Sequence, residues 1–294
     1  VNNKSYNHYS INISDYHKVY KCINEIKPDV IVHCAAQPSH DKAAEIIMDD
    51  YYTNAIGTHN LLESTRLINP ECIFINMSTN KVYGDMPNKV EMREDKSRYA
   101  ITDKRFLNGF DELLSIDQST HSLFGASKLS ADILVQEYGR YFNIPSCTLR
   151  GGCLTGPNHA SVELHGFVNY LIYANVNDIK YTVFGYKGKQ VRDNIHSKDV
   201  VKFFHEFIDN PKYGVVYNIG GGFANSISIL ESFDLIESIS NIQMNYQISE
   251  KNRVGDHICY YTNISKLQNH YPKWSIEYDI KDIFIEIYET IRTR

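Results

Sequence analysis

The hydrophobic and polar positions in the first half of the chain predict helices and strands in alternation. A helix cap at Ser14-Asp15 is followed by apolar residues at helical spacing, which are Val19, Cys22, Ile23 and Ile26. A continuous apolar run over 30–36 is typical of a strand buried in a parallel sheet. The pattern continues with a helix over 54–67, a strand over 72–76, a helix over 125–142 and a strand over 146–150. The predicted core positions of the helix over 54–67 are Ile56, Leu61, Leu62 and Leu67.

After Gly156-Pro157 the pattern is looser. It predicts strands over 181–184 and 215–219, and helices over about 198–209, 226–240 and 279–292. The alternation of strands and helices indicates an α/β protein with a Rossmann-like, doubly wound parallel sheet. We therefore expect this sheet in residues 1–155 and a smaller α/β region that binds substrate in residues 156–294, interleaved with the first.

Composition narrows the possible partners. The 294 residues are 43% hydrophobic and 22% charged, as in a globular protein, and the net charge of -5 gives no reason to expect nucleic acid or an anionic membrane as a partner. No apolar run approaches the ~20 residues of a membrane span. Six scattered cysteines without a C-x-x-C pair predict buried, reduced thiols in a cytoplasmic protein, and no metal site.

Polar side chains follow the predicted strands at the positions where parallel sheets bind ligands. The carboxyl ends of the strands lie at Ala36-Gln37, Ser78-Thr79 and 150–152. Downstream, the helix that opens near Ser122 places residues 124 and 128 on one face, because they are four residues apart. These segments together predict a ligand site at one edge of the sheet.

The sequence of residues 77–85, M-S-T-N-K-V-Y-G-D, together with S-L-F-G-A-S-K at 122–128, resembles the active-site frame of the extended short-chain dehydrogenase/reductase family, the NAD-dependent epimerases and dehydratases. The resemblance implies NAD as cofactor. It also implies that Thr79 bonds the reacting hydroxyl or ketone and that Ser78 lies along the cofactor. Lys128 would bond the nicotinamide ribose and lower the pKa of a neighbouring phenol.

Phe124 departs from that frame, because the family has tyrosine at this position. A phenyl ring keeps the packing of tyrosine but has no proton to exchange, and loss of a general acid/base lowers a rate by a factor of about 10²–10⁴. Three explanations remain open. Phe124 is a designed substitution, or it is a natural loss in a non-catalytic relative, or another group such as Thr79, Lys128 or a water carries the proton.

The resemblance is closest to the CDP-tyvelose (CDP-paratose) 2-epimerase branch. It rests on S-T-N-K-V-Y-G-D at 78–85, G-Y-K-G-K-Q-V-R-D at 185–193 and N-I-G-G at 218–221, and it extends from about residue 8 to 290. This branch implies that NAD takes hydride from C2 of a CDP-dideoxyhexose and returns it to the other face of the transient ketone. The substrate is then a nucleotide sugar, with a CDP-sugar favoured.

Carried over position by position, the resemblance assigns further residues. The cofactor-binding residues are Asn12, Ile13, Ala35, Ala36, Gln37, Asn54, Ser78, Lys128 and Arg150. The substrate-binding residues are Asn80, Arg192, Arg253 and Asp256, in which the forked guanidinium groups suit a diphosphate. The resemblance also implies a homo-oligomer that pairs through the helices over 54–67 and 125–142.

One family motif is absent. No G-x-x-G-x-x-G, whose backbone amides hold the cofactor pyrophosphate, occurs in the chain, which starts at Val1. We therefore expect a sheet that is incomplete at its N-terminal side, with exposed apolar surface and an unpaired edge. Two other functions remain open: a catalytically silent nucleotide-sugar-binding relative, or a sugar-nucleotide 4-epimerase or dehydratase. A dehydratase is disfavoured because Asn80-Lys81 replaces its usual acidic pair.

Overall fold

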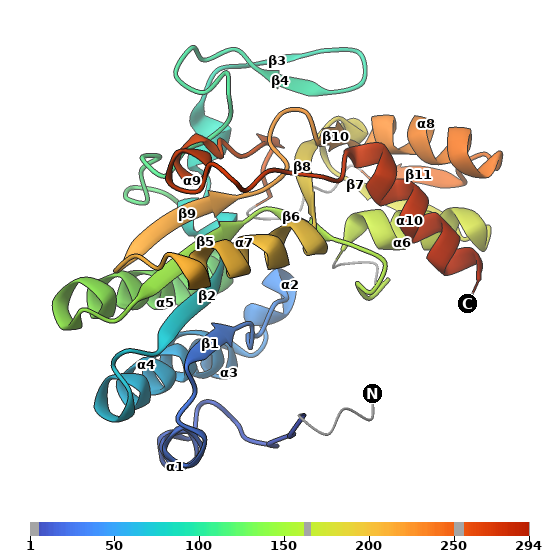
Figure 1. Cartoon of the computed structure of the whole chain (residues 1–294). Coiled ribbons are helices and arrows are strands. Elements are labelled where there is room, and N and C mark those ends of the chain that lie inside the picture. Colours follow the sequence, from blue (N-terminus) through green and yellow to red (C-terminus); the bar gives the residue numbers. More distant parts are fainter. Residues whose placement is uncertain (1–5, 162–165, 250–255, 294) are drawn as a thin grey trace.

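The main sheet has four parallel strands. The structure, a computed structural model, describes residues 6–161, 166–249 and 256–293. The strand order is β1 (Val30–His33), β2 (Ile73–Thr79), β5 (Ser146–Gly151) and β9 (Val215–Ile219). Each neighbouring pair is parallel, which confirms the predicted α/β fold with a parallel sheet (Figure 1).

Helices cover both faces of this sheet because successive side chains of a strand point to opposite faces. Phe74 of β2 packs with Leu62 of α4 (Gly57–Ile68) and Val135 of α5 (Ser122–Phe142). The next residue, Ile75, packs on the other face with Phe203 of α7 (Ser197–Asp209) and with Leu267 of α9 (Ser265–His270). The layers are those of a doubly wound sheet.

The N-terminal helices largely follow the predicted pattern. In α1 (Tyr16–Ile26), the Asp15 side chain accepts a hydrogen bond from the Lys18 amide, and Val19 and Ile23 are buried. Ile26, predicted on the same apolar face, is 44% exposed, since it lies in the last turn of the helix. Between β1 and α4 the chain forms three short helices, which are α2 (His40–Ala43), α3 (Ile47–Tyr51) and η1 (Tyr52–Ile56).

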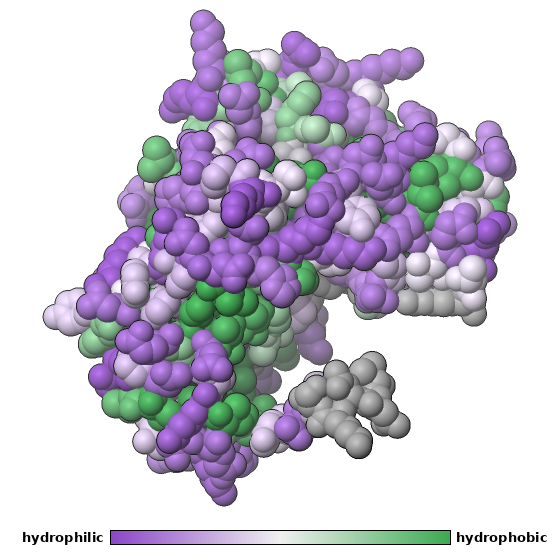
Figure 2. All heavy atoms as spheres, in the orientation of Figure 1, coloured by the Kyte–Doolittle hydropathy of each residue, from purple (hydrophilic) through white to green (hydrophobic). Residues whose placement is uncertain are grey.

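Strand β1 differs from its prediction in length and position. It ends at His33 rather than at residue 36, and it lies at the edge of the sheet, where Val32 is 39% exposed. An apolar run marks a strand but does not show whether the strand is central, and within the described residues β1 pairs only with β2. Figure 2 shows hydrophobic residues gathered below α7, over β1 and β2.

Leu67, predicted in the core, is 49% exposed at the end of α4.

The second half of the chain builds smaller sheets. Strand β8 (Val191–His196) pairs with β6 (Cys153–Thr155), β10 (Ser226–Ser228) and β12 (Cys259–Tyr260), and β7 (Tyr181–Phe184) pairs with β11 (Tyr246–Ser249). Helices α6 (Phe167–Val176), α8 (Ile229–Ser240) and α10 (Ile280–Arg292) pack around β7. The predicted helix over 226–240 was wrong in its first three residues, because Ser228 caps α8 in a capping box with Glu231.

The remaining elements are short. A hairpin joins β3 (Met92–Glu94) to β4 (Tyr99–Ile101), and the 3-10 helices are η2 (Asn80–Tyr83), η3 (Met86–Lys89) and η4 (Tyr186–Gly188). Cys72, Cys147 and Cys259 are buried as predicted, but Cys34 is exposed because β1 ends before it. In the described ranges, no helix combines the length and the apolar character needed to cross a bilayer.

Candidate active site

The end of β2 presents two hydroxyl groups at the carboxyl edge of the sheet. Ser78 is buried, and its Oγ donates a hydrogen bond of 2.6 Å to Oδ2 of Asp132 on α5. Thr79 is the last strand residue and the N-cap of η2, where its Oγ1 accepts the Lys81 amide at 3.2 Å. The strand therefore runs three residues beyond its predicted end and carries both hydroxyls into the turn.

Helix α5 places Lys128 against this strand end. Its Nζ donates a hydrogen bond of 2.7 Å to the Met77 carbonyl oxygen, and the residue is only 6% exposed. Burial lowers the pKa of Lys128 to about 8, although the carboxylate of Asp132 opposes the shift. Phe124, one turn earlier, is 8% exposed. The structure thus brings Ser78, Thr79 and Lys128 into one small region.

The turn after β1 is held next to the same helix. The Gln37 amide donates to Oδ1 of Asn54 at 2.9 Å, and Nδ2 of Asn54 donates to Ser127 Oγ at 3.0 Å. Asn54 is 1% exposed, so it ties the turn to α5 from inside the protein. Ala35 is exposed and Ala36 is half-buried, and both have small side chains.

The side chain of Arg150 forms its hydrogen bonds with buried residues of the protein. Its guanidinium donates to both carboxylate oxygens of Asp132, at 2.8 and 3.2 Å, and to the Tyr83 hydroxyl at 3.1 Å. Arg150 is 4% exposed and Asp132 is fully buried. Asp132 was not predicted from the sequence, although its spacing of four residues from Lys128 places both on one face of α5. Contact between Arg150 and a cofactor stays a prediction.

A second charged cluster joins η2 to the C-terminal half. Arg192 Nη2 lies 2.6 Å and Lys81 Nζ lies 3.4 Å from Oδ1 of Asp256. Burial raises the pKa of Asp256, but the two cations more than offset this and hold it well below its usual range. Burial lowers the pKa of Lys81. Lys81 was not predicted, although it directly follows Asn80, which was predicted to bind substrate.

The other predicted residues lie apart from this group. Arg253 lies outside the described residues. The Asn12 side chain accepts hydrogen bonds from the Ser14 amide and hydroxyl just before α1. Ile13 packs on Gly57 of α4 so closely that a β-carbon there would lie 2.6 Å from the isoleucine Cδ1. Cofactor binding by Asn12 and Ile13 stays a prediction.

The strand ends fit one half of a dinucleotide cofactor. Hydroxyls from Ser78 and Thr79, a buried ammonium from Lys128 and the small residues after β1 are groups that a nicotinamide riboside could contact. The printed sequence contains no glycine-rich phosphate loop. Within the described ranges, no cluster of three or more His, Cys, Asp or Glu side chains is placed to hold a metal ion.

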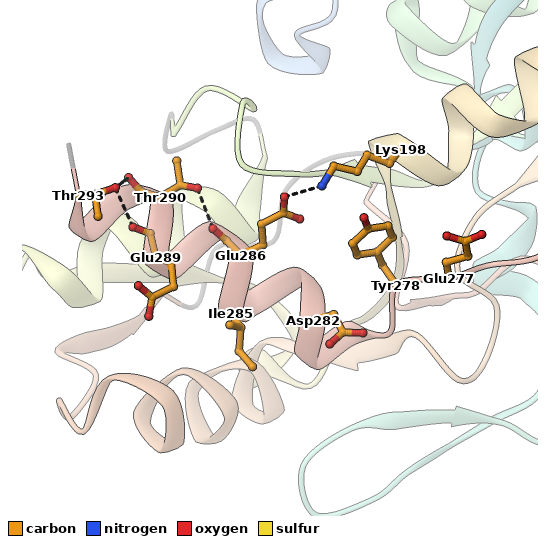
Figure 3. Close-up of a pocket in the computed structure, with 9 residues that line it drawn as sticks. All are labelled: Lys198, Glu277, Tyr278, Asp282, Ile285, Glu286, Glu289, Thr290 and Thr293. Carbon is orange, nitrogen blue, oxygen red and sulfur yellow. Dashed lines mark hydrogen bonds and ion pairs between the residues drawn. The ribbon is translucent and has the colours of Figure 1, made fainter.

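A hollow of about 730 Å³ lies elsewhere, beside α10 and the start of α7. Figure 3 shows Glu286 of α10 facing Lys198, with an ion pair of 2.8 Å between them. None of the predicted site residues lines this hollow. We therefore place the candidate active site at the strand ends, where the hydroxyls and Lys128 converge, and not in this hollow.

Comparisons with known proteins agree with the observed fold. A UDP-glucose 4-epimerase from Thermus thermophilus, solved in complex with NAD, superimposes with a TM-score of 0.80 at 20% identity, covering 99% of this chain and 86% of that one. CDP-paratose 2-epimerase from Salmonella typhi is 32% identical over 94% of this chain and 82% of its own length. dTDP-glucose 4,6-dehydratase from Escherichia coli is 28% identical over 75% of this chain, which spans 59% of that enzyme.

A sequence profile of the NAD dependent epimerase/dehydratase family matches residues 1–220. This match covers most of the chain and includes β2, α5 and the strand ends described above. Together with the identity to the 2-epimerase, it establishes the family. The chain belongs to the NAD dependent epimerase/dehydratase family.

Proposed function

We propose that this protein is an NAD-dependent epimerase that inverts C2 of a CDP-linked dideoxyhexose. The observation that carries the proposal is the 32% identity to a CDP-paratose 2-epimerase along 94% of the chain. The octapeptide at 78–85 supports it, because this segment resembles that branch and forms the end of β2 and η2, where Thr79 Oγ1 accepts the Lys81 amide.

The proposal assigns a role to each of the side chains at the strand ends and in the charged cluster around Asp256. Bound NAD would accept a hydride from the sugar and return it. Thr79 would hold the reacting sugar hydroxyl, and Lys128 would hold the nicotinamide ribose. Arg192 and Lys81 attract the diphosphate, since a charge-assisted hydrogen bond to phosphate is roughly twice as strong as a neutral one. Asp256 keeps these two cations in place.

The residues after Thr79 favour an epimerase over a dehydratase. A dehydratase must remove a proton from carbon and protonate a leaving hydroxyl, and the family uses an acidic pair for this. Here Asn80 is buried and Lys81 is paired with Asp256. A CDP-, UDP- and dTDP-sugar panel, followed by NMR of the products, tests the choice. We expect inversion at C2 of CDP-paratose, and loss of water from any sugar would contradict it.

A second candidate is a nucleotide-sugar-binding protein without catalysis, and Phe124 is the observation that favours it. The substitution Phe124→Tyr separates the two candidates. If the protein is a catalyst limited by the missing hydroxyl, the rate rises by about 10² or more. If the protein only binds, neither form turns over any sugar, while calorimetry still detects binding of CDP-paratose.

We further propose that the protein self-associates in the cytoplasm. The outer surfaces of α3 and α5 expose large apolar side chains, among them Met48, Tyr51 and Ile133, and such surfaces favour contact with another chain. The exposed thiol of Cys34 is compatible with a reducing compartment. Sedimentation equilibrium of the protein and of its Ile133→Asp variant tests self-association, and a monomer in both would contradict it.

A further inference from the structure

The carboxylate of Asp256 joins two cations from distant parts of the chain. Its Oδ1 lies 2.6 Å from Arg192 Nη2 and 3.4 Å from Lys81 Nζ, so it links β8 to η2. Asp256 itself lies in a loop, and strand β12 begins three residues later, at Cys259. The contacts of residues 256–258 must therefore fix the carboxylate between the two cations.

The side chain of Asn88 holds the main chain on both sides of His257. Its Nδ2 donates a hydrogen bond of 2.9 Å to the Asp256 carbonyl oxygen, and its Oδ1 accepts one of 2.7 Å from the Ile258 amide. The donor and the acceptor of one side-chain amide thus match an acceptor and a donor of the main chain, and this match fixes the orientation of the amide. Asn88 is half-buried in η3.

His257 adds a third bond between the same two segments. Its ring is fully buried and lies against the Tyr260 ring, with 5.3 Å between centroids. Nε2 lies 2.9 Å from the Gly84 carbonyl oxygen, and because a carbonyl only accepts, Nε2 is the donor. Burial lowers the pKa of His257 well below its usual range, so the ring is neutral. Three hydrogen bonds therefore attach residues 256–258 to residues 84–88.

The turn that receives these bonds is itself held in place. Oδ1 of Asp85 accepts the Thr120 amide at 3.0 Å. Gly84 has a φ of +57°, and a β-carbon there would lie 2.9 Å from the Thr120 carbonyl oxygen, so this position requires glycine. Residues 84–88 are thus a fixed support, and Lys81 lies in the 3-10 helix directly before them.

Sheet pairing fixes the other end of the segment. The Ile258 carbonyl oxygen accepts the Val191 amide at 3.0 Å, and Tyr260 pairs with Arg192 in the register of β12 and β8. Loss of the Asn88 side chain would leave this end on β8 and remove two of the three bonds at the other end. The carboxylate between the two cations would then lose most of its support from that side.

We propose that Asn88 is a positioning residue for the diphosphate of the substrate. This inference rests on the proposed function. By holding residues 256–258, Asn88 keeps Asp256 between Lys81 and Arg192, and so keeps the two cations together for one diphosphate. Both Oδ1 and Nδ2 of Asn88 are engaged with the main chain, so the residue acts through Asp256.

The affinity for CDP relative to cytidine tests the inference, because only CDP carries the diphosphate. Asn88→Ala should raise the Kd for CDP by about 10-fold, since weaker charge-assisted hydrogen bonds reach the phosphates. The Kd for cytidine, measured by NMR titration, should stay within about 2-fold of its original value. An unchanged Kd for CDP, or equal rises for both ligands, would overturn the inference.

A double-mutant cycle shows whether Asn88 acts through Asp256. In an Asp256→Asn background, which removes the carboxylate charge, Asn88→Ala should change the Kd for CDP by less than about 2-fold. The full rise of about 10-fold in this background would contradict a role through Asp256.

Asn69 provides a matched control. It is also half-buried, and its Nδ2 donates a hydrogen bond of 3.0 Å to the Pro28 carbonyl oxygen, near the start of β1. Asn69→Ala should lower the midpoint of urea unfolding about as much as Asn88→Ala and leave both Kd values unchanged. If Asn88→Ala does not fold, Asn88→Ser, which keeps a hydroxyl at this position, carries the same test, again with the loss of affinity confined to CDP.

The unsubstituted protein keeps the two proposals distinguishable. If it binds CDP no more tightly than cytidine, the diphosphate cluster of the proposed function is overturned, and this inference with it. If it prefers CDP and Asn88→Ala keeps the full preference, this inference alone is overturned.

Discussion

Two charge clusters lie near the candidate site, one buried and one half-buried, and they differ in how their charges are balanced. On α5 and β5, Arg150 and Asp132 form a one-to-one pair with two hydrogen bonds, and neutral hydroxyls surround it. Between η2 and β8, the described residues place Arg192 and Lys81 on the single carboxylate of Asp256.

From this difference we infer that the first cluster is structural, and we propose that the second binds the ligand. A balanced buried pair has no charge left for a ligand, so its contribution is to stability and to holding Ser78 at the strand end. The second cluster carries an excess positive charge among the described residues, and a diphosphate would balance it. Substitutions in the first cluster should therefore affect folding, and substitutions in the second should affect ligand affinity.

The largest expected effect comes from breaking the balanced cluster. Asp132→Ala leaves the Arg150 guanidinium buried without its carboxylate, and breaking such a pair costs about 3–5 kcal/mol of unfolding free energy. Urea unfolding followed by circular dichroism measures it. Glu289→Ala, which removes the exposed pair with Arg292, is the control and should change the value by less than about 1 kcal/mol. Equal effects of the two substitutions would contradict the structural assignment.

A smaller effect is expected from Lys128, which is buried on α5. Its folded pKa of about 8 lies below the ordinary 10.5, so between these values the unfolded chain binds more protons and stability rises with pH. At pH values below the folded pKa, the buried lysine is charged in the folded protein, and this lowers the free energy of unfolding by about 3 kcal/mol. Lys128→Met should lack this rise. Urea unfolding at several pH values measures it, and parallel curves for the two proteins would show that Lys128 is not desolvated as described.

The smallest expected effect concerns the unbalanced cluster. Arg192→Gln removes a charged donor, so the Kd for CDP-paratose should rise by about 10- to 100-fold, while unfolding by urea changes little. Calorimetric titration gives the Kd. Arg93→Gln, at an exposed arginine, should leave it unchanged. A loss of stability without a loss of affinity would place this cluster with the structural one.

The sequence predicted the structural features that depend on a pattern of a few neighbouring residues. Helical spacing placed Phe124 and Lys128 on one face of α5, and the octapeptide placed Thr79 at a strand end, because both features are contained in a few neighbouring residues. Strand β1 was recognised by its apolar run, but its edge position was not, since the run carries no information about the strand's neighbours.

Contacts between distant segments were not predictable in this way. Lys81 and Asp256 are 175 residues apart, and Arg150 meets Asp132 only because β5 lies under α5. Asn88 meets the Ile258 amide across 170 residues. In each case the residue type was visible in the sequence, and the partner depended on tertiary packing.

The central claim is hydride chemistry at C2 of a CDP-sugar, and an isotope label tests it most directly. CDP-paratose carrying deuterium at C2 is incubated with the protein and NAD in ordinary water, and the product is examined by NMR. We expect inversion at C2 with the deuterium retained, because the same hydride leaves and returns. Inversion with deuterium lost to water, or no inversion with either Phe124 or Phe124→Tyr, would contradict the account.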